Sequence, residues 1–89
     1  MKLLYCNNCN DIFELPANCT ERHCQCYQSK GRYVSVIEWS AEYSGPCVPI
    51  GFNSKQFVHA TRNQPENEPA VIFEAFVIPK NCRTFRRTD

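Results

Sequence analysis

Cys6-Asn7-Asn8-Cys9 and Cys24-Gln25-Cys26 are the two short stretches that decide the fold of this chain, and fourteen residues separate them. Zinc takes four ligands in a tetrahedron, and thiolates suit it. Two cysteines on one tight turn place two sulfurs at neighbouring corners, and a second turn supplies the other two. The spacing is close to that of zinc sites with C-x2-C on both sides. It predicts one structural Zn²⁺ held by Cys6, Cys9, Cys24 and Cys26.

The residues beside the first pair favour such a turn. A zinc knuckle needs residues that tolerate left-handed backbone, and Asn7, Asn8 and Asn10 do so. The second pair is less regular, because it is C-x-C and Tyr27 follows where Gly or Asn would be easier. Cys19 or His23 therefore remains an alternative ligand on that side.

Seven cysteines could also serve in disulfides, in an iron–sulfur cluster or as free thiols. Disulfides need an oxidising compartment, and the first ten residues show no signal-peptide pattern, so we expect a reducing cytoplasm, bacterial or phage-infected. Seven is also odd, which leaves a thiol over in any disulfide scheme. An iron–sulfur cluster uses the same ligand type and stays the main metal alternative. Free thiols and a redox C-x-x-C are weaker interpretations, and we expect Cys47 and Cys82 to be packed thiols.

The length and the net charge of the chain limit which kinds of protein it can be. A chain of 89 residues makes one domain with a thin core, which a metal or a partner commonly supports. The formal net charge is +1, and four thiolates on one Zn²⁺ would bring it to −1. Such a balance does not favour strong DNA binding. No stretch is long enough to span a membrane.

We divide the domain into a zinc-binding head (1–31), a β–α–β layer (32–80) and a basic tail (81–89) that faces solvent. In the head, residues 3–5 and 12–15 read as short strands around the first turn. Residues 32–44 read as one long strand, with Ile37, Trp39, Ala41 and Tyr43 on one face. Residues 53–63 read as a helix capped by Asn53 or Ser54, with Phe57, Val58 and Thr61 on a shared face.

Residues 70–78 give the strongest strand signal, because both faces are apolar except at Glu74. That pattern predicts a central strand covered on both sides. The chain as a whole is predicted to be α+β: zinc-ribbon-like N-terminal β hairpins, then a small antiparallel sheet with one short helix.

A weak ligand site is predicted around the helix entrance. A glycine before a helix lets a ligand approach the backbone, and the helix N-terminus attracts anions. A carboxylate in an apolar strand is paired, protonated or at the rim of a pocket. The candidate residues are Trp39, Gly51, Asn53, Ser54 and Glu74.

The chain resembles a set of small bacterial and phage proteins of uncharacterised function that begin with a ribbon-like C-x-x-C and C-x-C pair. The similar parts are residues 6–15, 24–33, 41–45, 48–53 and 73–80. Tyr27 departs from the glycine expected after the second pair. The resemblance implies a zinc-ribbon-like head and supplies no function.

Three functions follow from these residues. The first is a non-catalytic binding module for a small anionic or nucleotide-like ligand or for a protein partner. That partner could also be another copy of the chain in an oligomer. The alternative is a zinc ribbon that binds nucleic acid through Tyr27, Lys30, Arg32 and Tyr33. An enzyme that uses Glu74 and His59 as acid and base ranks last, since no catalytic spacing supports it, and we expect a protein without enzymatic activity.

Overall fold

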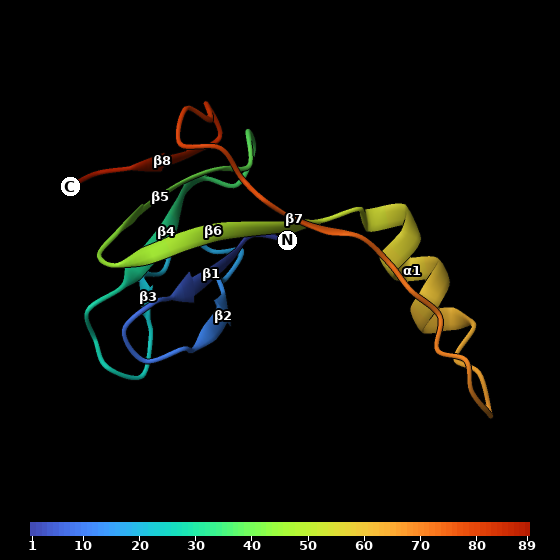
Figure 1. Ribbon diagram of the computed structural model, residues 1–89. Coiled ribbons are helices and arrows are strands. Elements are labelled where there is room, and N and C mark those ends of the chain that lie inside the picture. Colours follow the sequence, from blue (N-terminus) through green and yellow to red (C-terminus); the bar gives the residue numbers. More distant parts are fainter.

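The computed structural model describes residues 1–89 and consists of two small four-stranded sheets and one short helix (Figure 1). The antiparallel first sheet has the order β2 (Ile12–Glu14), β1 (Leu3–Cys6), β6 (Cys47–Phe52) and β7 (Ala75–Val77). The second sheet has the order β3 (Arg22–His23), β4 (Lys30–Ser35), β5 (Ser40–Ser44) and β8 (Phe85–Arg87). The helix is α1 (Ser54–Arg62), which is too short and too polar to cross a membrane. The predicted α+β class is correct, with strands predominating.

The hydrophobic core is built from alternate residues of both sheets. Leu4 of β1 and Phe13 of β2 are buried together with Tyr33, Tyr43 and Phe85 of the second sheet. Gly31 of β4 allows close approach here, because a Cβ at that position would lie 2.9 Å from Cδ1 of Leu4. Only 15 of the 89 residues are buried, so the core is as thin as the chain length predicts.

The first hairpin confirms the two short strands predicted around the first cysteine turn. β1 and β2 pair with Leu4 opposite Phe13, and residues 7–9 form the turn after β1. Alternation explains the pairing, since Leu4 and Phe13 both face the core while Ile12 and Glu14 are exposed.

The long strand predicted over residues 32–44 is wrong. Pairing of β4 with β5 shifts register at Tyr33 and Ser35, and residues 36–39 form a turn. Trp39 has a positive φ of 54°, and the main-chain N–H of Glu38 donates to Oγ of Ser35. Ala41 and Tyr43 face the core as predicted, but Ile37 is 90% exposed.

The helix predicted over residues 53–63 is confirmed, with Asn53 as its N-cap. The side chain of Asn53 accepts a hydrogen bond of 3.2 Å from the main-chain N–H of Gln56. Phe57 stacks on Phe52 and meets Phe73 edge to face, which fastens α1 to the end of β6. The predicted face is otherwise exposed, and α1 projects away from the two sheets (Figure 1).

Two C-terminal expectations are wrong. Residues 70–78 do not form a central covered strand: β7 spans only Ala75–Val77, lies at a sheet edge and is exposed along its length. The tail does not simply face solvent, because β8 pairs in parallel with β5 and Phe85 is fully buried. Both segments depend on contacts with residues far away in the sequence, which alternation of residue types does not report.

Candidate metal centre

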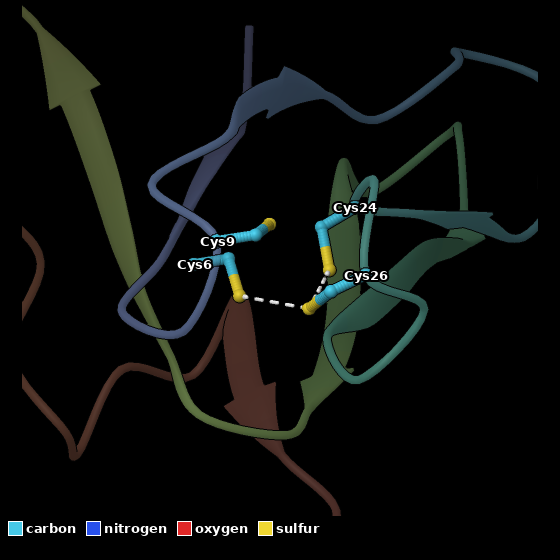
Figure 2. A group of neighbouring side chains, drawn as sticks. All are labelled: Cys6, Cys9, Cys24 and Cys26. Atoms are coloured by element: carbon cyan, nitrogen blue, oxygen red, sulfur yellow. Dashed lines mark hydrogen bonds between the residues drawn. The ribbon is translucent and has the colours of Figure 1, made fainter.

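The sulfur atoms of Cys6, Cys9, Cys24 and Cys26 all lie within 4.8 Å of one another. Figure 2 shows the four side chains pointing to one place from two separate loops. The Sγ of Cys26 is 3.8 Å from the Sγ of Cys6 and 3.4 Å from that of Cys24. Cys6 and Cys24 are buried, whereas Cys9 and Cys26 are partly exposed.

The first loop follows β1 directly and is a tight turn. The N–H of Asn10 donates to the carbonyl of Cys6 at 2.8 Å, and the N–H of Cys6 donates to the carbonyl of Asp11 at 2.9 Å. Asn10, the residue after the second cysteine of the pair, has a left-handed φ of 62°. The asparagine there suits that conformation, as the sequence indicated.

The second loop connects β3 to β4 and repeats this arrangement. The N–H of Tyr27 donates to the carbonyl of Cys24 at 3.1 Å, and the N–H of Cys24 donates to the carbonyl of Ser29 at 2.9 Å. Tyr27, again the residue after the second cysteine, has a φ of 65°. A left-handed residue with a side chain costs about 1–2 kcal/mol, so this loop stores backbone strain. The ring of Tyr27 lies 3.9 Å from that of His23, centroid to centroid.

Three hydrogen bonds point at the sulfur atoms. Ser29 is fully buried; its N–H donates to Sγ of Cys24 at 3.3 Å and its hydroxyl to Sγ of Cys6 at 3.2 Å. The side-chain amide of Asn8 donates to Sγ of Cys26 at 3.3 Å. Such donors stabilise thiolates and orient metal ligands. They also cross between the two loops, since Ser29 contacts Cys6 and Asn8 contacts Cys26.

The donors shift the acidity of the buried thiols. Burial favours the neutral form of Cys24, but the hydrogen bonds from Ser29 and the neighbouring thiols outweigh it and lower its pKa to about 6. The Ser29 hydroxyl lowers the pKa of Cys6, whereas burial raises the pKa of Cys9. Thiolates are the form that binds metal, so the two buried cysteines are prepared for that role.

The cluster fits a single tetrahedral ion. Bonds of about 2.3 Å from zinc to four sulfurs require sulfur–sulfur separations near 3.8 Å. The separations of 3.4 and 3.8 Å agree with that requirement. No disulfide is formed, and all seven cysteines are free. The four cysteines can therefore hold a metal ion.

The remaining cysteines and His23 lie outside the cluster. Cys47 is buried beside it, opposite Cys6 across β1 and β6, and its pKa is raised by burial. Cys82 precedes β8, where hydrogen bonds from Thr84 lower its pKa. His23 turns Nδ1 toward the carbonyl of Cys24, 3.0 Å away.

The residues that the sequence predicted as a small-molecule binding site lie in two separate places. Trp39 lies in the β4–β5 turn, with its ring edge-on to Tyr33. The other four gather where β6 enters α1: Gly51, Asn53, Ser54 and Glu74. There the N–H of Asn53 donates to the carbonyl of Glu74 at 3.0 Å, and Glu74 also bonds to the side chain of Gln56. Glu74 is exposed rather than embedded, because β7 is an edge strand.

Sequence reasoning missed Ser29 and Asp11, and it named Asn8 only as a turn residue and not as a donor to sulfur. A carboxylate oxygen of Asp11 accepts a hydrogen bond of 3.1 Å from the N–H of Gln25, which ties the first loop to the second. A serine three residues after a C-x-C pair, before a strand, was the signal available for Ser29. The contacts of Asn8 and Asp11 cross between loops and carry no local signal.

No protein family, curated protein or solved structure matches this chain. The fold and the cysteine cluster describe a small α+β protein in which four clustered cysteines can hold a metal ion.

Proposed function

We propose that this chain is a zinc-stabilised, non-catalytic binding module. The observation that carries the proposal is the convergence of four cysteine sulfurs within 4.8 Å. A metal held by four protein ligands has no open position for a substrate, which is typical of structural rather than catalytic zinc. The reducing cytoplasm expected for this chain would keep the four thiols available to a metal.

The placement of the ligands supports a structural role. Cys6 ends β1 of the first sheet, and Cys24 follows β3 of the second. A metal on these ligands would join the two sheets at one end of a core of few residues. Binding energy of that kind is folding energy, because the site does not exist in the unfolded chain.

Zinc is favoured over an iron–sulfur cluster by the size of the site. The sulfurs of a multi-iron cluster bind different irons and therefore lie farther apart than those around one ion. Four sulfurs within 4.8 Å suit one ion. A single iron on four thiolates would absorb visible light, whereas Zn²⁺ would not, which gives a simple test.

The proposed ligand of the module is an anion. A hollow of about 370 Å³ is lined by the C-terminal segment, including Lys80, Arg83, Arg86 and Arg87. Of these four cations only Arg87 has a carboxylate partner, Asp89. Unpaired cations around a hollow attract phosphate or carboxylate groups. A nucleotide-like ligand has both the charge and the size for this place.

Metal content tests the structural role. We expect one zinc per chain in protein purified without chelator, measured by elemental analysis and native mass spectrometry. Cys24→Ser should lose both the zinc and the folded NMR spectrum. Cys82→Ser is the matched control, because Cys82 lies outside the cluster, and it should retain both. A folded wild-type chain without metal, or zinc retained by Cys24→Ser, would overturn the proposal.

Nucleic-acid binding is the second candidate, and the same cations favour it. Fluorescence anisotropy with single- and double-stranded oligonucleotides at low salt should be compared with thermal shifts produced by mononucleotides and pyrophosphate. Response to small anions alone supports the small-ligand module; oligonucleotide binding that weakens steeply with salt supports the alternative. Arg83→Ala should weaken either response, whereas Arg62→Ala, on the distant helix, should not.

A further inference from the structure

Strand β7 is an open sheet edge with an apolar surface. It is the last strand of the first sheet, and Ala75, Phe76 and Val77 are all exposed. Val77 is 67% exposed, and Ile72, three residues before the strand, is 87% exposed. The sequence of residues 70–78 has the composition of a strand covered on both faces, yet Ala75–Val77 within it are exposed along their whole length.

The main-chain groups of β7 show which side is open. In its ladder with β6, the N–H of Ile78 donates to the carbonyl of Pro49, and the carbonyl of Glu74 accepts from Asn53. Main-chain groups alternate in direction along an antiparallel strand. Ala75 and Val77 therefore turn their N–H and C=O groups away from β6, toward the open side.

The other three sheet edges are protected in ways that β7 is not. Charged residues stand on each of them: Glu14 on β2, Arg22 on β3, and Arg86 on β8. Charges and prolines on an edge discourage pairing with another chain. β7 carries no charge, proline or bulge within Ala75–Val77.

We propose that β7 pairs antiparallel with β7 of a second copy of this chain. A two-fold axis at Phe76 places Ala75 of each copy opposite Val77 of the other. In each copy, Ala75 and Val77 present two outward N–H and two outward C=O groups. These groups form four hydrogen bonds between the two copies, so the edge is complementary to itself. The result is one continuous eight-stranded sheet across the dimer.

Side chains fit the same register. The ring of Phe76 lies over Gly51 of its own chain and stays 52% exposed, since a Cβ at Gly51 would come 2.7 Å from that ring. At the axis it would meet Phe76 of the second copy, and aromatic cross-strand pairs are stabilising.

The dimer depends on β7 alone and does not require the metal proposed above. We would measure mass by analytical ultracentrifugation over a concentration series, on protein whose metal content is known. The wild type should reach about twice the chain mass of 10.3 kDa. The amides of Ala75 and Val77 should gain hydrogen-exchange protection as concentration rises.

Two variants test the register. Val77→Pro removes an outward N–H and leaves the ladder with β6 intact; it should weaken dimerisation about thirty-fold, because two symmetry-related hydrogen bonds are lost. Val77→Lys should also separate the copies, while Ile37→Lys, at a 90% exposed site in the β4–β5 turn, should not. All three should keep the metal content of the wild type. A wild type of single-chain mass at every concentration, or dimerisation unchanged by both Val77 variants, would overturn the dimer.

Discussion

The guanidinium of Arg87 donates a hydrogen bond of 2.8 Å to the main-chain carbonyl of Cys47. Cys47 is the strand partner of the cluster residue Cys6. Arg87 therefore links the C-terminal strand to the cysteine cluster through Cys47. The same guanidinium donates to the carbonyl of Gly45 at 2.7 Å and lies over the ring of Tyr43. One side chain thus holds the whole turn between β5 and β6.

Arg87→Ala should destabilise the protein by about 1–2 kcal/mol, a value reduced for the partial exposure of the side chain. Two carbonyls lose a charged donor, and the Tyr43 ring loses its cation. Urea denaturation at constant metal loading measures the change. Arg86→Ala is the matched control: the side chain of this neighbouring arginine makes no hydrogen bond or ion pair within the chain, so equal losses from both variants would contradict the role of Arg87.

Asp89 should make stability depend on pH. The N–H of Gly45 and the guanidinium of Arg87 hold the pKa of Asp89 below its ordinary value of 3.8. Its contribution is therefore complete above that value and is lost as pH falls through the lower pKa of the folded state. Melting temperatures of wild type and Asp89→Asn should differ at neutral pH and converge in acid. A difference that persists unchanged below the folded pKa would contradict this origin.

Ser29→Ala should weaken metal binding by about tenfold or more, in the range for lost partners of metal ligands. The variant removes the hydroxyl that donates to Cys6 and keeps the main-chain N–H that donates to Cys24. Competition with a chromophoric chelator gives the affinity. Ser40→Ala serves as control, because the Ser40 hydroxyl makes no hydrogen bond within the protein, and its metal affinity should match the wild type.

Replacement of Tyr27 should separate backbone strain from side-chain contact. Tyr27→Asn and Tyr27→Ala both lose the ring that packs on His23, but asparagine tolerates a φ of 65° better than alanine does. The asparagine variant should be the more stable of the two by about 1 kcal/mol. Thermal denaturation of the zinc-loaded proteins measures it; equal stabilities would mean that the loop relaxes without cost.

Gly45→Ala should cost about 3 kcal/mol or more, because the site has a φ of 98° and a Cβ would lie 2.1 Å from the carbonyl oxygen of Gln28. That backbone belongs to the second cysteine loop and cannot move freely. Gly51→Ala is the comparison, since its added Cβ meets only the exposed ring of Phe76, which can turn away. Circular dichroism at rising temperature should show a far larger loss for Gly45→Ala.

Local patterns predicted the local parts of this protein. The cysteine pairs, the first hairpin and the capped helix each depend on residues within one turn or one strand, and the cluster of Cys6, Cys9, Cys24 and Cys26 agrees with its spacing. Left-handed backbone after each pair was also foreseeable at Asn10 and was noted as a difficulty at Tyr27.

Long-range pairing explains the failures. Alternation over residues 32–44 did not reveal the turn in which Trp39 takes a positive φ. Apolar residues continue to alternate with polar ones through this turn, so the pattern looks like that of one unbroken strand. The apolar run at 70–78 indicated burial without saying what covers it. The arginines on both sides of Phe85 made this segment look like an exposed tail. The burial of Phe85 is explained by the parallel pairing of β8 with β5.

The buried Phe85 has a consequence for biosynthesis. All four cluster cysteines lie within residues 6–26, whereas the ring that completes the core is translated some sixty residues after the last of them. During translation the nascent chain can offer its thiolates to metal well before β8 leaves the ribosome. The metal would then hold the two cysteine loops together before Phe85 has been synthesised to complete the core between the sheets.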